Sequence, residues 1–176
     1  MSPRQWKGFS LLEVLTVLAV ACALIAATAP SFALSQREAA LTASVNQLLG
    51  ALHFARSAAI LRNTPTIICL SANGQQCADS ASVESAKGWL VLESARSRAV
   101  GEARNSDLPL RRADLPENVA IHGSRALLTF WPTSRAGTSG TFVLCSRRPP
   151  ISARKVVVSQ TGRPRVADAH TEECAP

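Results

Sequence analysis

Apolar residues form a continuous run near the N-terminus and a periodic pattern after it. Residues 9–34 are almost uninterrupted apolar residues, with Glu13 as the single charge. Beyond this run, apolar side chains recur at three- and four-residue steps at Leu41, Val45, Leu48, Leu52, Ala55 and Ala59. Such spacing places them on one stripe of a helix. Because Pro65 disfavours helix in the residue before it, the pattern predicts one long helix that ends near Asn63.

Short runs of β-branched and other apolar residues follow the helix, separated by turn residues such as Asn73-Gly74. The predicted strands cover residues 66–72, 88–94, 119–123, 126–131, 141–146 and 155–160. Residues 95–117 are rich in Arg, Ser and Asp and hold few large apolar side chains, which predicts a loop. One long helix laid against an antiparallel sheet is the economical arrangement, so we expect an α+β fold.

The apolar run is long enough to cross a bilayer, which takes about 20 residues. A conventional secretory signal places its apolar stretch before the cleavage site. Here the order is reversed, because the apolar run begins immediately after the first eight residues, which carry Arg4 and Lys7. Basic flanks stay in the cytoplasm. The pattern therefore predicts a single-pass membrane anchor with the domain outside the cytoplasm. A generic signal anchor would explain the length, but it leaves the Glu13 carboxylate without a partner in lipid.

The 176 residues leave room for one domain beside this anchor, since domains usually contain about 100–150 residues. The formal charge is +7, and it is unevenly distributed. Residues 118–167 contain no acidic residue and hold Arg125, Arg135, Arg147, Arg148, Arg154, Lys155, Arg163 and Arg165. A terminal acidic cluster, Asp168, Glu172 and Glu173, partly offsets these charges. This imbalance favours an anionic partner.

The chain has five cysteines. Cys22 lies in the apolar run, where we interpret it as a small packing residue. The other four are Cys69, Cys77, Cys145 and Cys174, and they permit three disulfide pairings. Cys69 with Cys77 would close a hairpin-sized loop, and Cys145 with Cys174 would tie a strand to the C-terminal tail; both need an oxidising compartment. Zinc is the competing interpretation, but no C-x-x-C pair is present and only His170 lies near these cysteines. We expect disulfides, with no metal and no cofactor.

Catalytic chemistry has little support in the sequence. The three histidines, His53, His122 and His170, are scattered and belong to no motif that pairs them with a nucleophile or a metal. A phosphate-binding glycine loop of the P-loop type is also missing. We therefore predict that the chain is not an enzyme.

The remaining candidate for chemistry is the segment Gly162-Arg163-Pro164-Arg165, which follows the predicted strand 155–160. Gly162 tolerates the positive φ of a turn, and Pro164 restricts Arg163. In an extended chain, alternation puts both guanidiniums on one side about 6.6 Å apart, a separation comparable with that of successive nucleic-acid phosphates. Arg suits such contacts because its planar fork binds phosphate in a bidentate manner. A solvated basic turn that only keeps the domain soluble is the competing interpretation.

Two sets of motifs resemble a known family. The string GFSLLEV near the N-terminus resembles a type IV prepilin leader. That resemblance implies cleavage after Gly8, methylation of Phe9, and pairing of Glu13 with the N-terminal amine of a neighbouring subunit. Later segments resemble the GspH/FimT family of minor pilins and pseudopilins: LHFARSAAILRNTPTIIC, DLPENVAIHG, LTFWPTSRAGTSGTFVLC and RKVVVSQTGRPRV. The implied organisation is a leader (1–8), a transmembrane and filament-core helix (9–34), and a periplasmic or extracellular pilin domain (35–176).

The resemblance also suggests a function for the basic turn, which is similar to the GRxR motif by which FimT-type minor pilins bind DNA in natural transformation. It implies non-sequence-specific binding of duplex DNA by Gly162, Arg163, Pro164 and Arg165, with a footprint shared by Arg147, Arg148, Arg154 and Lys155. Few aromatic residues and no Tyr are available for stacking on single strands. Other pilins, the prepilin peptidase and the inner membrane are the further partners expected. The alternative is a structural minor pilin or type II secretion pseudopilin that primes filament assembly without binding DNA.

Overall fold

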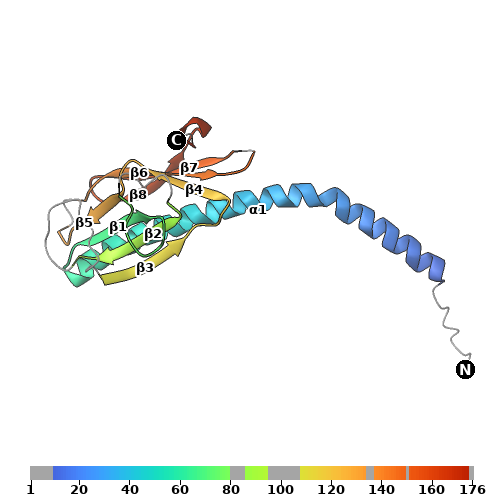
Figure 1. Ribbon diagram of the computed structural model, residues 1–176, viewed down its shortest axis with the longest axis horizontal. Helices are drawn as coiled ribbons and strands as arrows, with labels where there is room; N and C mark the ends of the chain where they lie inside the picture. Colours follow the sequence, from blue (N-terminus) through green and yellow to red (C-terminus); the bar gives the residue numbers. More distant parts are fainter. Residues whose placement is uncertain (1–9, 80–85, 95–107, 134–136, 150, 175–176) are drawn as a thin grey trace, which may run out of the picture. The chain divides into compact units, whose positions relative to one another are not determined.

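The computed structural model describes residues 10–79, 86–94, 108–133, 137–149 and 151–174 (Figure 1). Within helix α1 the side chains of residues 27–31 are not described. The chain divides into two compact units, residues 1–36 and residues 37–176. Gly8 and Phe9, the predicted cleavage and methylation positions, lie outside the described residues.

Helix α1 (Leu11–Arg62) belongs to both units. In the first unit its large apolar side chains are exposed, at Leu11, Leu12, Val14, Leu15, Val17, Leu18, Val20, Leu24, Ile25, Phe32 and Leu34. Glu13 is exposed among them, and its carbonyl accepts a hydrogen bond of 2.9 Å from the Thr16 hydroxyl. Within the described residues, no helical stretch meets both the length and the hydropathy of a membrane span.

The C-terminal end of α1 lies where the sequence predicted it. Asn63 has a φ of 51°, which places it in the left-handed conformation that commonly terminates a helix. Pro65 follows two residues later and cannot continue the helix.

In the described part of the second unit, eight strands form two antiparallel sheets beside α1 (Figure 1). The first sheet has the order β3-β2-β1-β5 and is built from β1 (Thr66–Ser71), β2 (Gly88–Glu93), β3 (Leu108–Asp114) and β5 (Leu127–Phe130). The second sheet has the order β4-β6-β7-β8 and is built from β4 (Val119–Gly123), β6 (Gly140–Ser146), β7 (Ala153–Val158) and β8 (Pro164–Asp168). The expected α+β fold is confirmed, with two sheets in place of the single one predicted.

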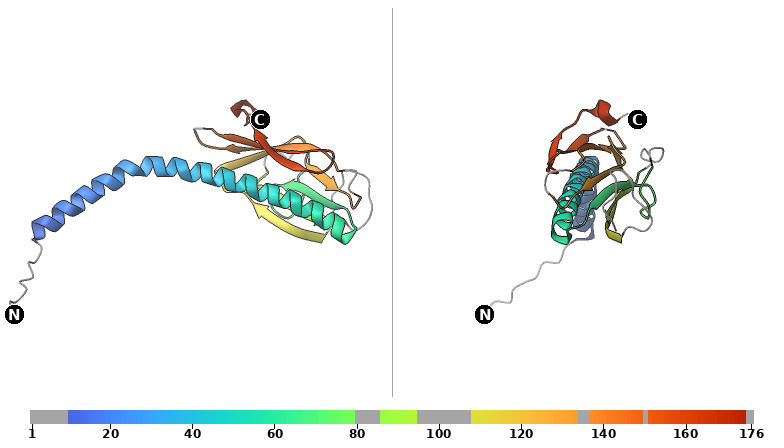
Figure 2. Two further views of the ribbon diagram at one scale, coloured as in Figure 1. Left: turned by 180° about the vertical axis from the view of Figure 1, so that it is seen from behind. Right: turned by 90° about the vertical axis from the view of Figure 1, so that its left-hand side faces the viewer.

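The core lies between the second-unit part of α1 and both sheets (Figure 2). All six residues of the predicted apolar stripe are buried. They share one cluster with Ile68 and Val91 of the first sheet and with Phe142, Leu144 and Val156 of the second. Full burial of one Val, Leu, Ile or Phe side chain stabilises the fold by about 1.5–3 kcal/mol. The helix thus holds the two sheets together.

Two strands lie where the sequence analysis predicted none. β3 falls within the predicted loop 95–117, whose residues 95–107 are outside the description. It is a largely exposed edge strand, so it lacks the apolar alternation that identifies a half-buried strand. The strand pairs with β2. It also contacts helix α1, because the Arg111 guanidinium lies 4.4 Å from the centre of the Phe54 ring. β8 begins inside the predicted turn, at Pro164, a position that proline can take on an edge strand.

Both expected disulfides are present. Cys69 and Cys77 have Cα atoms 5.5 Å apart and tie β1 to the loop that follows it. Cys145 and Cys174 have Cα atoms 5.8 Å apart and tie β6 to the C-terminal 3-10 helix η2 (Thr171–Cys174). Cys22 is a free, exposed thiol in the first unit.

Candidate nucleic-acid interface

The basic turn, Gly162–Arg165, begins in the loop of the hairpin that joins β7 to β8 and continues into β8. The Gly162 N–H donates to the Ser159 carbonyl at 2.8 Å, and the Ser159 N–H donates to the Arg163 carbonyl at 3.1 Å. Gly162 has a φ of 72°. A turn followed by a left-handed residue is a standard three-residue hairpin loop, which explains why glycine stands at this position. A further hydrogen bond closes the same loop, because the Ser159 hydroxyl oxygen accepts from the Arg163 N–H at 3.2 Å.

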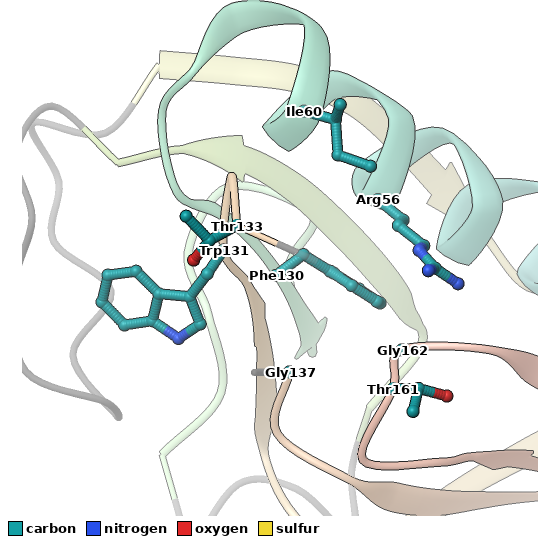
Figure 3. A pocket seen from close by; sticks show the side chains of 8 residues that line it. All are labelled: Arg56, Ile60, Phe130, Trp131, Thr133, Gly137, Thr161 and Gly162. Atoms are coloured by element: carbon teal, nitrogen blue, oxygen red, sulfur yellow. The ribbon is translucent and has the colours of Figure 1, made fainter. Parts of the chain in front are cut away.

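The turn is held against the first sheet and against helix α1 (Figure 3). A Cβ atom added to Gly162 would lie 3.3 Å from two carbons of the Phe130 ring and 3.8 Å from Cδ of Arg56. The Gly137 N–H donates to the Gln160 carbonyl at 3.1 Å. A small pocket at this junction is lined by Arg56, Ile60, Phe130, Trp131, Thr133, Gly137, Thr161 and Gly162. Contacts from three other segments therefore fix the position of the loop.

Both arginines of the turn are exposed and lie on the same face of the hairpin. Arg165 pairs with Val157, and Arg163 precedes the pair of Pro164 and Val158. Val156 and Val158 are buried in the core, so side chains of the other parity point to the outer face of the second sheet. Arg163 and Arg165 have that parity and are exposed. The structure thus gives the two guanidiniums the arrangement that strand alternation predicted.

The other predicted DNA-binding cations do not gather at this turn. Arg147 and Arg148 follow the C-terminal end of β6, whereas the turn lies beside its N-terminal end, because Gly140 pairs with Val158. Seven residues of strand place the two groups about 23 Å apart. The Arg147 Nε donates to the Val119 carbonyl at 3.3 Å. The structure therefore divides the predicted footprint between two ends of the sheet.

Arg154 and Lys155 lie on β7 between these ends. Arg154 is exposed and donates to its neighbour's carbonyl, that of Ala153, at 3.3 Å. The Lys155 Nζ pairs with both carboxylate oxygens of Glu173, at 3.0 and 3.3 Å. The donor groups of Lys155, and then the backbone N–H of His170, hold the pKa of the Glu173 carboxyl below its usual value. Lys155 is thus already paired with an internal carboxylate.

Comparison with known protein families identifies the family of this chain. The family model described as type II transport protein GspH matches residues 44–162. This chain belongs to the GspH family. The match ends at Gly162, so it does not include Arg163 and Arg165. No curated protein matches the chain at a significant level.

Solved structures resemble this GspH-family protein at low sequence identity. One is the type IV minor pilin FimU of Pseudomonas aeruginosa, with 19% identity and a TM-score of 0.48, covering 74% of this chain and 94% of that chain. Another is the minor pseudopilin EpsH from the type 2 secretion system of Vibrio cholerae, with 12% identity and a TM-score of 0.49, covering 72% of this chain and 95% of that chain.

The fold of this GspH-family protein also brings cations to the turn that sequence analysis did not assign to it. Arg56 of α1 extends toward the loop that carries Thr161 and Gly162 (Figure 3). Arg125 lies at the same end of the second sheet, because the Ser124 N–H donates to the Thr141 carbonyl and Thr141 pairs with Val157. Position along the helix gave no signal for Arg56, since its proximity to Gly162 depends on tertiary packing.

Within the described part of the chain, the cations differ in whether they have an internal partner. Hydrogen bonds, ion pairs or ring contacts are made by the side chains of Arg37, Arg62, Arg111, Arg112, Arg147, Arg154 and Lys155. No such contact is made by the side chains of Arg56, Lys87, Arg125, Arg148, Arg163 and Arg165. Most of this second group lies around the turn. A guanidinium without an internal partner is available for a charge-assisted hydrogen bond to an external anion.

Proposed function

We propose that this chain is a minor pilin whose Gly162–Arg165 turn binds duplex DNA through its phosphates, without reading base sequence. The observation that carries the proposal is the pair Arg163 and Arg165, which are exposed on one face of an anchored hairpin loop. Neither guanidinium has a partner among the described residues. Phosphate contacts of this kind position a protein on DNA and carry no sequence information directly.

The position of the turn suits a subunit that meets an external ligand. Arg37, the first residue of the second unit, donates to the Pro149 carbonyl at 3.1 Å, so the β6–β7 loop lies at the start of that unit. The turn instead lies beside Arg56, which is about 29 Å further along the helix at 1.5 Å per residue. Within the second unit, the turn therefore lies at the end opposite to the residues with which that unit begins.

The proposed setting is the inner membrane, with the domain in the periplasm, and outside the cell once the subunit is built into a pilus. Two disulfides suit an oxidising compartment. The exposed apolar residues of α1 would be covered by lipid or by neighbouring pilins. The prepilin peptidase would act at Gly8, and DNA uptake in natural transformation is the process that the turn would serve.

Fluorescence anisotropy tests the proposal on the full-length protein in a nonionic detergent, with labelled duplexes of unrelated sequence. We expect equal affinity for all duplexes and a linear fall of log affinity with log salt, with a slope near −0.9 for each neutralised phosphate. Absence of binding at low salt, or a strong preference for one sequence, would contradict the proposal.

A structural subunit that primes filament assembly without binding DNA is the second candidate. The description of the matching family as a type II transport protein supports it, as does the row of exposed apolar side chains in α1. A pseudopilin of this kind needs the helix and its partners but has no evident need for Arg163 and Arg165. Loss of secretion or piliation on deletion of the gene, together with no DNA binding by the protein, would favour this candidate.

A further inference from the structure

We propose that Arg56 of helix α1 is a further phosphate contact of the same site. The helix and the β7–β8 hairpin would then both contact the DNA backbone. This inference rests on the proposed DNA binding by the turn. It adds an arginine that lies more than a hundred residues before the turn in the sequence and that belongs to another element of the fold.

Geometry places the Arg56 side chain against the loop. Its Cδ is 3.8 Å from the position that a Cβ on Gly162 would take, and Arg56, Thr161 and Gly162 line the same pocket. Figure 3 shows the guanidinium extending from α1 toward the loop, whereas Trp131 points away from it. Because Cδ is bonded directly to the guanidinium nitrogen Nε, the charge of Arg56 lies next to the turn that presents Arg163.

Charge and burial agree with this role. Arg56 is half-buried, which limits its freedom, yet its guanidinium has no hydrogen-bond or ion-pair partner among the described residues. Arg62, six residues further along the same helix, is instead paired with Glu93 at 2.8 Å. A half-buried guanidinium without a partner, next to the loop that carries Gly162, gains a charge-assisted partner when a phosphate binds at the turn.

The stem of Arg56 also packs on the turn, so the test must separate charge from packing. Arg56→Gln keeps much of the stem and removes the charge, and Arg56→Lys keeps the charge. Arg37→Gln is the matched control, because it removes one charge from the same helix about 29 Å away. A variant carrying both Arg163→Gln and Arg165→Gln reports on the turn itself.

The measurement is the salt dependence of affinity for a random duplex, made on the full-length protein in nonionic detergent. We expect Arg56→Gln to flatten the slope by about 0.9 and to weaken binding roughly fivefold at 0.15 M salt. Arg56→Lys should keep the slope, and Arg37→Gln should match the wild type.

An unchanged affinity and slope for Arg56→Gln would overturn the inference. A weaker affinity with an unchanged slope would overturn it as well, since Arg56 would then act only by packing on the turn. If the Arg163→Gln, Arg165→Gln variant loses about two slope units while Arg56→Gln loses none, the inference about Arg56 fails and the proposed function stands. If neither variant changes the slope, the proposed function fails.

Discussion

At the scale of single residues, Gly162 decides whether the basic turn can form. Its positive φ and its contact with the Phe130 ring leave no ordinary place for a side chain. The sequence predicted the first property from the Gly-Arg-Pro-Arg pattern. It could not predict the second, because Phe130 reaches Gly162 only through the packing of one sheet against the other.

Gly162→Ala should destabilise the domain by about 1–3 kcal/mol, the usual range for a residue held in a strained backbone conformation. The matched control is Gly50→Ala in α1, where an added Cβ meets nothing within 4 Å. That change should be neutral or should stabilise the helix by up to about 1 kcal/mol. Thermal unfolding followed by circular dichroism measures both. Equal melting temperatures for the two variants would show that the turn does not require glycine.

At the scale of elements, the sequence predicted the helix and its buried stripe and missed two of the four edge strands, β3 and β8. β3 and β8 have one or both faces exposed, so neither shows the apolar alternation that marked the central strands. The sequence also grouped Lys155 with the DNA-binding cations. In the structure the C-terminal tail returns through the Cys145–Cys174 bond and places Glu173 on Lys155.

Glu173→Gln should therefore strengthen DNA binding, because it frees Lys155 on the same face as Arg165. We expect up to about 0.9 units of additional slope and roughly a fivefold gain at 0.15 M salt. Glu172→Gln removes the same charge from a side chain with no partner in the described residues, so its effect should be smaller. The gain should vanish when Lys155→Gln is added. A gain that persists without Lys155 would contradict this account of the tail.

The Lys155–Glu173 ion pair should be lost in acid. Because the Glu173 pKa lies below the ordinary value of 4.5, the carboxylate stays charged and paired with Lys155 at neutral pH. The stabilisation that this pair gives is present above that value and is lost as the pH falls below it. The free energy of unfolding of the wild type should therefore approach that of Glu173→Gln only in acid, where the Glu173 carboxylate is protonated.

At the scale of the whole molecule, cations that are close in sequence are not close in space. Residues 147–165 look like one basic segment, but a strand runs its full length between Arg148 and Arg163 and separates their ends of the sheet. Sequence analysis therefore located the turn, but it grouped with the turn cations that lie at the other end of the sheet. The tertiary fold removes Arg147 and Arg148 from the turn and brings Arg56 to it.

The prepilin interpretation of the N-terminus makes a prediction for the whole chain. Mass spectrometry of the protein from the membrane or filament fraction should find N-methylated Phe9 as the first residue. Gly8→Val should leave the uncleaved precursor in the inner membrane, because the larger side chain would not fit the peptidase. A wild-type protein that keeps Met1 in the filament fraction would contradict the interpretation.

The most direct test of the central claim compares two variants, each of which lacks two positive charges at one end of the second sheet. The measured quantity is the salt dependence of duplex binding. One variant carries Arg163→Gln and Arg165→Gln, and the other carries Arg147→Gln and Arg148→Gln. Both have the same net charge, and circular dichroism checks that the second variant stays folded, since it also loses the Arg147–Val119 hydrogen bond. We predict that the first variant flattens the slope by about 1.8 units and weakens binding roughly thirtyfold at 0.15 M salt, while the second stays close to the wild type. Equal losses from the two variants, or an unchanged slope in the first, would contradict the account.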